Sequence, residues 1–223
     1  MATVPVDAYI KAANAFLAKS DGRDKLLAAI QYAAMVVSAG TAGNALLVQK
    51  SVSSARKPLR VMKPVETVLP LVFGPPSSAP LPLQALTKLR ILAMAVYFGG
   101  DHVVWAGQAG ILKDKDLVDN AQKCSLYGWL IGSLCVIADQ GTGLVKLEAK
   151  AKELTEEAEL AAAAAKRTTH AIAIAGSATQ AIVALGLLKI VPMQPRTIGA
   201  IGVLSSLISC YQLMPAVEKP KQS

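Results

Sequence analysis

Two apolar segments near the C-terminal end constrain the fold of this chain more than any other feature. Residues 171–191 contain four polar side chains, and the only charged one, Lys189, is close enough to the end to reach lipid headgroups. As a helix these residues would span about 31 Å, close to the hydrocarbon thickness of a bilayer. Residues 198–214 are at the short limit for a span. The pair predicts a transmembrane hairpin, with a buried hairpin in a soluble protein as the alternative.

Both segments carry small residues along one helical face, which allows helices to approach closely in lipid. These residues are Ala173, Ser177, Ala181 and Ala184 in the first segment and Gly199, Gly202, Ser206 and Ser209 in the second. A third apolar stretch, residues 126–145, contains Asp139 and Gln140. A carboxylate is costly inside a bilayer, so we expect this stretch to lie at the interface or against neighbouring helices. Two spans are therefore predicted.

The composition and periodicity predict an all-α, membrane-associated helical bundle with interfacial amphipathic helices and a C-terminal transmembrane hairpin. Apolar residues make up 53% of the chain but aromatic residues only 4%, a mixture that suits closely packed helices near a bilayer. No stretch has the period of a strand. We expect three regions: an N-terminal helical membrane-shaping region on the cytosolic face (residues 1–147), a charged helical connector (148–170) and the hairpin with its basic tail (171–223).

The charge of the chain favours an anionic membrane over nucleic acid. The formal net charge is +8, and in residues 1–70 nine bases minus four acids leave +5. No exposed stacking aromatics accompany these bases, so we expect no nucleic-acid partner. The basic N-terminal region and the basic tail both favour the cytosolic side, and two spans place both termini there.

Residues 50–69 form the most informative amphipathic pattern. At 100° per residue, an apolar arc (Val52, Ala55, Leu59, Met62, Val65, Leu69) faces a basic arc (Ser53, Arg56, Lys57, Arg60, Lys63, Thr67). A basic amphipathic helix of this kind lies on a membrane, with its apolar face among acyl chains and its bases at phosphates. The residues predicted to bind lipid are Lys50, Arg56, Lys57, Leu59, Arg60, Met62 and Lys63.

Two features of this region leave alternatives open. The same pattern fits a helix that packs on a core and keeps a solvated basic face. Pro58 can open a helix, but Pro64 then falls in its interior, which predicts two short pieces with a kink between them. Earlier in the chain, Ser20 and Asp24 resemble a capping box that opens a helix.

Catalytic chemistry is not predicted. The only histidines are His102 and His170, and no nucleophile motif, phosphate loop or dinucleotide fingerprint accompanies them. The three cysteines lack metal-ligand spacing and are interpreted as buried apolar residues. We expect no enzyme, no cofactor and no metal.

Five motifs together resemble the peroxin-eleven family of peroxisomal membrane elongation proteins, and in particular its members from the green lineage. They are SDGRDKLL (20–27), SARKPLR (54–60), DHVVWAG (101–107), SLYGWLIG (125–132) and SSLISCYQL (205–213). The likeness covers nearly the whole chain in order.

The resemblance implies a protein of the peroxisomal membrane with both termini in the cytosol. It also implies lipid binding through an amphipathic helix, self-association, membrane elongation that promotes peroxisome proliferation and fission, and recruitment of dynamin-type fission machinery. The family's amphipathic helix maps onto residues 50–69, and the tail around Lys219 and Lys221 is similar to a coat-protein-binding dilysine signal. An alternative function is an unselective pore for small metabolites.

Overall fold

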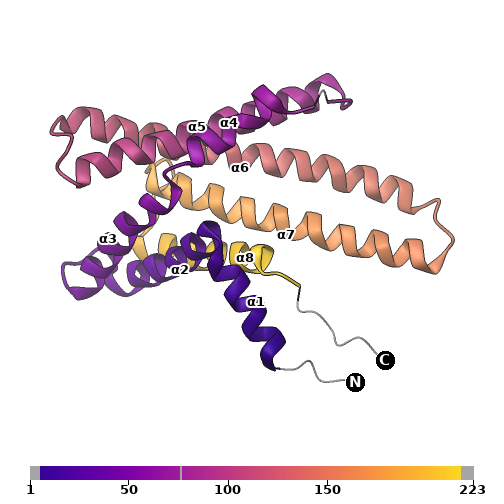
Figure 1. Cartoon of the computed structure of the whole chain (residues 1–223), viewed down its shortest axis with the longest axis horizontal. Helices are drawn as coiled ribbons and strands as arrows, with labels where there is room; N and C mark the ends of the chain where they lie inside the picture. The colour runs from indigo at the N-terminus through magenta and orange to yellow at the C-terminus, as the bar shows by residue number, and fades with distance from the viewer. Residues whose placement is uncertain (1–5, 76, 217–223) are drawn as a thin grey trace. The chain divides into compact units, whose positions relative to one another are not determined.

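The structure is a computed structural model that describes residues 6–75 and 77–216. All regular secondary structure in these residues is helical, which confirms the all-α prediction (Figure 1). The helices are α1 (Val6–Ala18), α2 (Ser20–Ser38), α3 (Asn44–Arg56), the 3₁₀ helix η1 (Pro58–Arg60), α4 (Lys63–Phe73), α5 (Leu81–Gln108), α6 (Lys115–Ala151), α7 (Glu157–Leu187) and α8 (Pro195–Leu213).

The chain divides into two compact units. Unit 1 comprises Met1–Arg60 and Pro195–Ser223, and unit 2 comprises Val61–Gln194. The three functional regions expected from the sequence stay a prediction. The boundary at residue 60 falls inside the segment 50–69, and the boundary at residue 194 separates the two segments of the expected hairpin.

In unit 1 the two long helices α2 and α8 pack against each other in antiparallel directions. Gly199 faces Val36, and Gly202 faces the ring of Tyr32. A Cβ atom at Gly199 would lie 2.9 Å from Val36 Cγ2 and a Cβ at Gly202 would overlap the Tyr32 ring. Glycine is therefore required for this close approach, and the small face predicted on residues 198–214 packs on α2.

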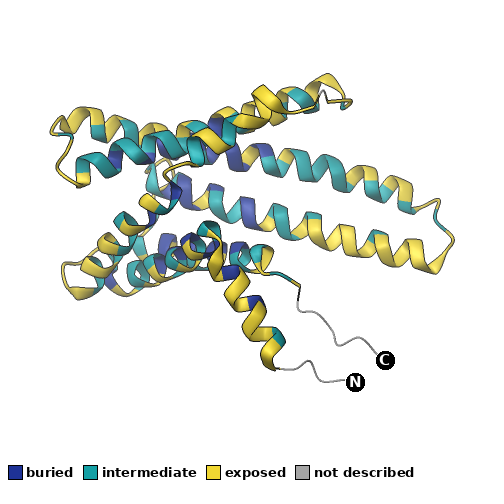
Figure 2. Ribbon diagram, in the orientation of Figure 1, coloured by how far each residue is buried: buried dark blue, intermediate teal, exposed yellow. Residues whose placement is uncertain are grey.

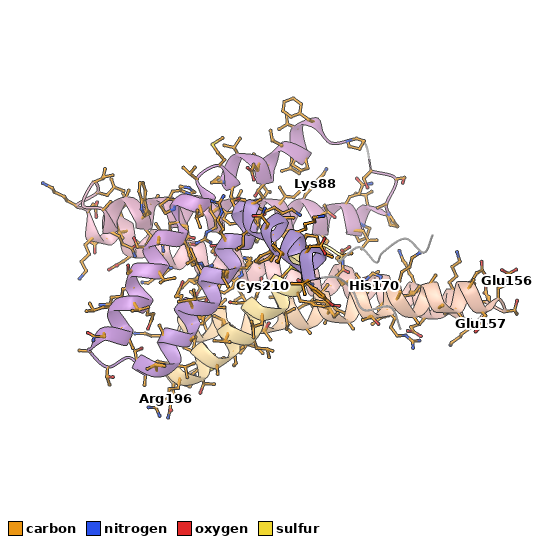
Figure 3. All side chains as sticks on the ribbon, turned by 60° about the horizontal axis from the view of Figure 1, so that its bottom comes forward. Lys88, Glu156, Glu157, His170, Arg196 and Cys210 are labelled. Atoms are coloured by element: carbon orange, nitrogen blue, oxygen red, sulfur yellow. The ribbon has the colours of Figure 1, made fainter. Side chains whose placement is uncertain are left out.

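Unit 2 contains three long antiparallel helices, with α4 packed on α5. Between α5 and α6, the Ser125 hydroxyl donates a hydrogen bond to the Tyr97 carbonyl oxygen at 2.8 Å. Between α6 and α7, Trp129 Nε1 donates to Gln180 Oε1 at 3.1 Å. Leu130, Ala181 and Ala184 form a small core beside that bond. The far ends of α6 and α7 project beyond this core, and the end of α7 is largely exposed whereas that of α6 is mostly half-buried (Figure 2). Glu156 and Glu157 lie at the outer end (Figure 3).

Three of the described helices, α5, α6 and α7, are long and apolar enough to cross a membrane by length and composition. Helix α7 contains most of the first predicted span, residues 171–191. Helix α6 contains residues 126–145, which the sequence placed at the interface or against neighbouring helices because of Asp139, and α6 packs on α5 and α7. Helix α8, which contains most of the second predicted span, is not among the three. The two segments of the expected hairpin lie in different units, because α8 packs on α2 within unit 1 and α7 lies in unit 2, and their crossing of a membrane stays a prediction.

Candidate membrane-contacting site

The predicted amphipathic segment is a broken helix in the structure. Helix α3 ends at Arg56, Pro58 opens the short η1, and α4 begins at Lys63 with Pro64 in its first turn. A proline in the first turn of a helix removes no intrahelical hydrogen bond, so both prolines occupy positions that suit them. The two-piece form is the one observed.

The basic residues at the centre of this segment are buried. Arg56, Lys57 and Arg60 expose only 8%, 6% and 5% of their surface. Arg56 and Arg60 contact Asp24 of α2, which is 1% exposed. Helix packing within unit 1 thus covers side chains that a helical projection places on an outer face.

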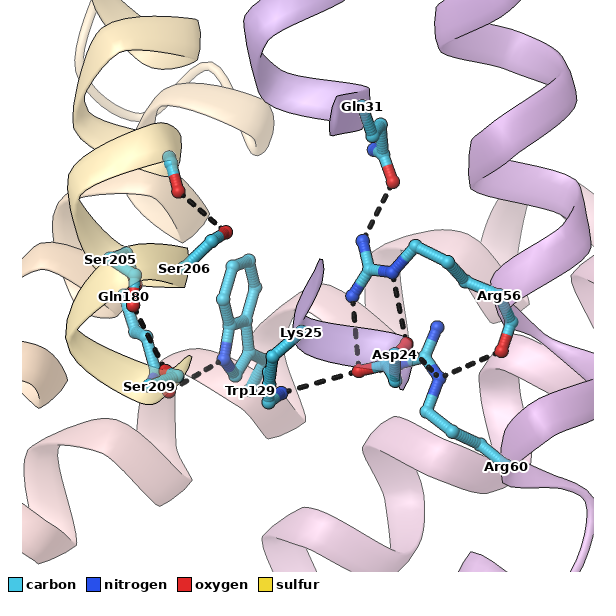
Figure 4. Close-up of polar contacts among 11 residues, drawn as sticks. Asp24, Lys25, Gln31, Arg56, Arg60, Trp129, Gln180, Ser205, Ser206 and Ser209 are labelled. Atoms are coloured by element: carbon cyan, nitrogen blue, oxygen red, sulfur yellow. Dashed lines mark hydrogen bonds and ion pairs between the residues drawn. The ribbon is translucent and has the colours of Figure 1, made fainter. Parts of the chain in front are cut away.

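Asp24 accepts hydrogen bonds from the guanidinium of Arg56, with Nε 2.9 Å from Oδ1 and Nη2 3.3 Å from Oδ2 (Figure 4). Arg60 Nε lies 3.5 Å from the same Oδ1, and Lys25 Nζ lies 3.4 Å from Oδ2. Arg56 Nη1 also donates to the side-chain oxygen of Gln31 at 2.7 Å. One carboxylate therefore joins three cations from α2, α3 and η1, and we call Asp24, Lys25, Arg56 and Arg60 the Asp24 cluster.

The electrostatics of the Asp24 cluster favour the ionised carboxylate. Burial alone would raise the pKa of Asp24, but the charges of Lys25, Arg56 and Arg60 and the Arg56 hydrogen bond outweigh it and hold the pKa well below its usual range. The sequence had assigned Asp24 to a capping box. In the structure α2 begins at Ser20, its N-cap Lys19 makes no side-chain capping hydrogen bond, and the Asp24 carboxylate binds arginine instead.

The other predicted lipid-binding residues lie in more open positions. Lys50 is exposed on α3, Leu59 is half-buried, and Met62 is exposed just before α4. Lys63 is partly exposed, and its Nζ lies 3.1 Å from the Glu66 carboxylate. The seven residues thus separate into a buried basic group and an accessible group.

Helix α4 presents a row of large apolar side chains to the outside. These are Met62, Val65, Leu69, Val72 and Phe73, and their exposed fractions lie between 43% and 78%. The spacing of three and four residues places them along one side of the helix, and no residue of α4 is buried. We call this set the α4 apolar row. The sequence had identified its first three members as part of the apolar arc but not Val72 and Phe73, because the arc was ended at Leu69.

These features define an all-α helical protein of the membrane type. It has three long apolar helices, and its helices approach one another through glycine and serine. The family model described as peroxisomal biogenesis factor 11 (PEX11) matches residues 10–214. The chain belongs to this family of peroxisomal membrane proteins.

Curated plant proteins are similar over nearly the whole chain. Peroxisomal membrane protein 11E of Arabidopsis thaliana is 36% identical over 213 residues, with 92% of each chain covered. Peroxisomal membrane protein 11C of the same plant is 35% identical over 217 residues, again with 92% of each chain covered. Peroxisomal membrane protein 11-5 of Oryza sativa subsp. japonica is 36% identical over 217 residues, which cover 92% of this chain and 93% of the relative. No solved structure matches.

Proposed function

We propose that this protein curves and elongates the peroxisomal membrane, and so promotes peroxisome proliferation and fission, by inserting the α4 apolar row into one leaflet. The observation that carries the proposal is the exposure of the row, which reaches 68% at Val72 and 78% at Phe73. Each large apolar side chain that moves from water into hydrocarbon contributes about 1.5–3 kcal/mol when it is fully buried. Five such side chains are ample to hold a helix at the interface, where it expands one leaflet relative to the other.

The proposal does not assign lipid binding to the buried bases, which the sequence predicted to bind lipid. Arg56 and Arg60 engage Asp24 inside unit 1. Attraction to anionic phospholipid is therefore assigned to accessible lysines such as Lys50 and Lys63. Membrane insertion then depends mainly on apolar surface, which salt does not screen.

The packing of α2 and α8 also supports a topology with an even number of crossings. Gly40, just after α2, lies beside Pro195, the first residue of α8, with a Cβ at Gly40 placed 3.2 Å from Pro195 Cγ. Because α2 and α8 are antiparallel, their outer ends at Ser20 and Leu213 share a side, which we propose is the cytosol.

Helices α6 and α7 are the pair that we propose to cross. The contacts between Trp129 and Gln180 and between Gln140 and His170 set their register. In this register the apolar stretches of the two helices lie side by side at the same height along the helix axes. In α5 the exposed Lys88 and Arg90 fall near the middle of the same band, because Tyr97 of α5 lies opposite Ser125 of α6. Two charged side chains at that depth cost more than the single Asp139 of α6, so α5 is not assigned a crossing.

Three further parts of the proposal follow from the family resemblance. They are self-association, recruitment of dynamin-type fission machinery, and binding of coat proteins through Lys219 and Lys221. The two lysines lie outside the described residues.

Tubulation by the full chain tests the proposed function. We expect the protein reconstituted into anionic vesicles to draw tubules, and the double variant Leu69→Asp/Val72→Asp to leave the vesicles round, since a carboxylate does not enter hydrocarbon. The control Ser77→Asp/Ser78→Asp adds the same charge at exposed positions after α4. Equal tubulation by the Leu69/Val72 variant would contradict the proposal. Solute leakage at unchanged vesicle shape would favour the pore.

A further inference from the structure

Unit 1 has an unusual distribution of polar and apolar residues. Its interior holds the Asp24 cluster and the serines of α8 beside Phe16, Ala28, Tyr32 and Ile198, and large apolar side chains also lie on its outer surface. The exposed apolar residues of its two long helices are Leu26, Ile30 and Val37 on α2 and Leu204, Leu207 and Tyr211 on α8, with exposed fractions from 44% to 72%. In a soluble protein contiguous apolar surface of this kind is rare.

The exposed apolar residues form one continuous row on each helix, at positions 26, 30, 33 and 37 of α2 and 200, 204, 207 and 211 of α8. The other exposed residues of these helices, Arg23 on α2 and Arg196, Thr197 and Gln212 on α8, lie toward the helix ends. Both rows follow the four-three-four spacing of a single helical face. Every member of the two rows is Ala, Val, Leu, Ile or Tyr. We call them the α2 row and the α8 row.

The opposite face of α8 is packed in the manner of a membrane helix. Gly199 and Gly202 bring α8 close to α2. Ser206 Oγ donates to the Gly202 carbonyl oxygen at 2.7 Å and Ser209 Oγ donates to the Ser205 carbonyl oxygen at 2.9 Å. These hydroxyls are satisfied inside their own helix without water, as a nonpolar surrounding requires.

We infer that the α2 row and the α8 row face lipid acyl chains, so that the α2–α8 pair is embedded in the membrane. Acyl chains fit better than a second copy of the chain because exposed apolar residues also occur on other helices of unit 1, at Val6 and Ile10 of α1 and at Leu47 of α3. One partner surface would cover a single face, whereas a solvent of hydrocarbon covers all of them. No charged residue lies within either row to specify a protein partner.

The length of the rows limits how deeply the pair is embedded. From residue 26 to residue 37, α2 rises about 18 Å, against about 30 Å for a hydrocarbon core. The Asp24 cluster ends this apolar stretch on one side, and Arg196 lies near the other end. The pair is thus embedded without crossing. This inference rests on the membrane location of the family and is independent of whether α4 generates curvature.

Spin labels on the full chain distinguish the surroundings of the two rows. Cys124, Cys135 and Cys210 are first replaced by alanine, and a single cysteine is introduced by Ile30→Cys or Leu204→Cys and labelled with a nitroxide. Circular dichroism of each variant verifies that the helical content is retained. In anionic vesicles we expect oxygen, which concentrates in hydrocarbon, to collide with both labels several-fold more often than a water-soluble nickel chelate does. Ser51→Cys, at an exposed polar position of α3, serves as the control with the reverse order.

Two outcomes would overturn the inference. Frequent nickel collisions at Ile30→Cys and Leu204→Cys would place the rows in water. Rare collisions with both reagents would place them against protein, as at an interface with a second copy. The same labels are then measured in the Leu69→Asp/Val72→Asp background. Loss of tubules with both labels still in hydrocarbon supports the inference whatever becomes of the proposed function.

Discussion

Asp24 is the residue whose substitution should affect the fold most. Its carboxylate joins Lys25 of its own helix to Arg56 and Arg60, which arrive from α3 and η1. Removing one partner from a buried ion pair typically costs about 3–5 kcal/mol, because desolvated charge is left behind. A helical wheel of residues 50–69 shows which bases share a face but not whether water or protein covers that face. For this reason the sequence alone could not place Arg56 and Arg60 against Asp24.

Replacing Asp24 by alanine should lower the free energy of unfolding by about 3–5 kcal/mol. Asp7 provides the matched control, since its pair with Lys11 is exposed and Asp7→Ala should change stability by less than about 1 kcal/mol. Denaturant unfolding of the purified chain in detergent, followed by circular dichroism, measures both. Equal effects of the two substitutions would mean that the Asp24 cluster does not hold α2, α3 and η1 together.

The same carboxylate gives stability a defined pH dependence. Because the folded-state pKa of Asp24 is lowered, the ionised carboxylate stabilises the fold fully above its ordinary pKa of 3.8. That contribution decreases as the pH falls below about 4, where the unfolded chain takes up a proton and the folded chain resists it. Unfolding free energies measured from pH 7 down to pH 3 should fall less for Asp24→Asn than for the natural chain. Parallel decreases in the two proteins would assign the effect to other carboxylates.

At the scale of helices, the sequence predicted which segments are helical better than it predicted which helices pack against each other. The apolar residues 171–191 and the prolines 58 and 64 correctly indicated a long helix and a break, since both depend on neighbours along the chain. The partner of α8 could not be read in this way. Its small face fits any helix that permits close approach, and α2 lies more than 150 residues away in the sequence. Adjacent apolar segments suggested that residues 198–214 pair with residues 171–191, whereas in the structure α8 packs on α2.

Two glycine substitutions should have opposite effects on helix packing. Gly202→Ala places a methyl group in the ring of Tyr32, and overpacking of this kind costs about 1–3 kcal/mol. Gly141→Ala meets nothing within 4 Å, so it should be neutral or stabilise α6 by about 0.5–1 kcal/mol through helix propensity. Thermal unfolding of both variants in detergent compares them. Equal melting temperatures would contradict the close α2–α8 contact.

On the scale of the whole chain, the proposed topology makes the turn between α6 and α7 the far end of a membrane hairpin. Arg167 and Glu148 brace that end through two hydrogen bonds, at 2.5 Å and 2.6 Å. All residues of the turn except Leu154 are exposed, including Glu156. The sequence alone identified this region as a charged connector. Only the structure shows how α6 and α7 align, and so which residues lie beyond their apolar stretches.

A cysteine at the turn should therefore be shielded in intact peroxisomes. In a chain without natural cysteines, Glu156→Cys should react with a membrane-impermeant maleimide only after detergent is added, whereas Ser51→Cys should react at once. With an odd number of crossings, the two ends of the chain would lie on opposite sides of the membrane. With no crossing, the turn would lie on the same side as both ends. Immediate labelling at both positions would contradict the topology.

The central claim is that insertion of the α4 apolar row, and not attraction between basic side chains and anionic lipid, drives tubulation. The salt dependence of tubulation tests this claim most directly, and it needs no variant. Between about 0.01 M and about 1 M salt the Debye length falls from about 30 Å to about 3 Å, which screens accessible charges and leaves hydrophobic insertion intact. We predict that the full chain, reconstituted in anionic vesicles, draws tubules across this range. Loss of tubules at high salt, with the protein still in the vesicles, would contradict the account.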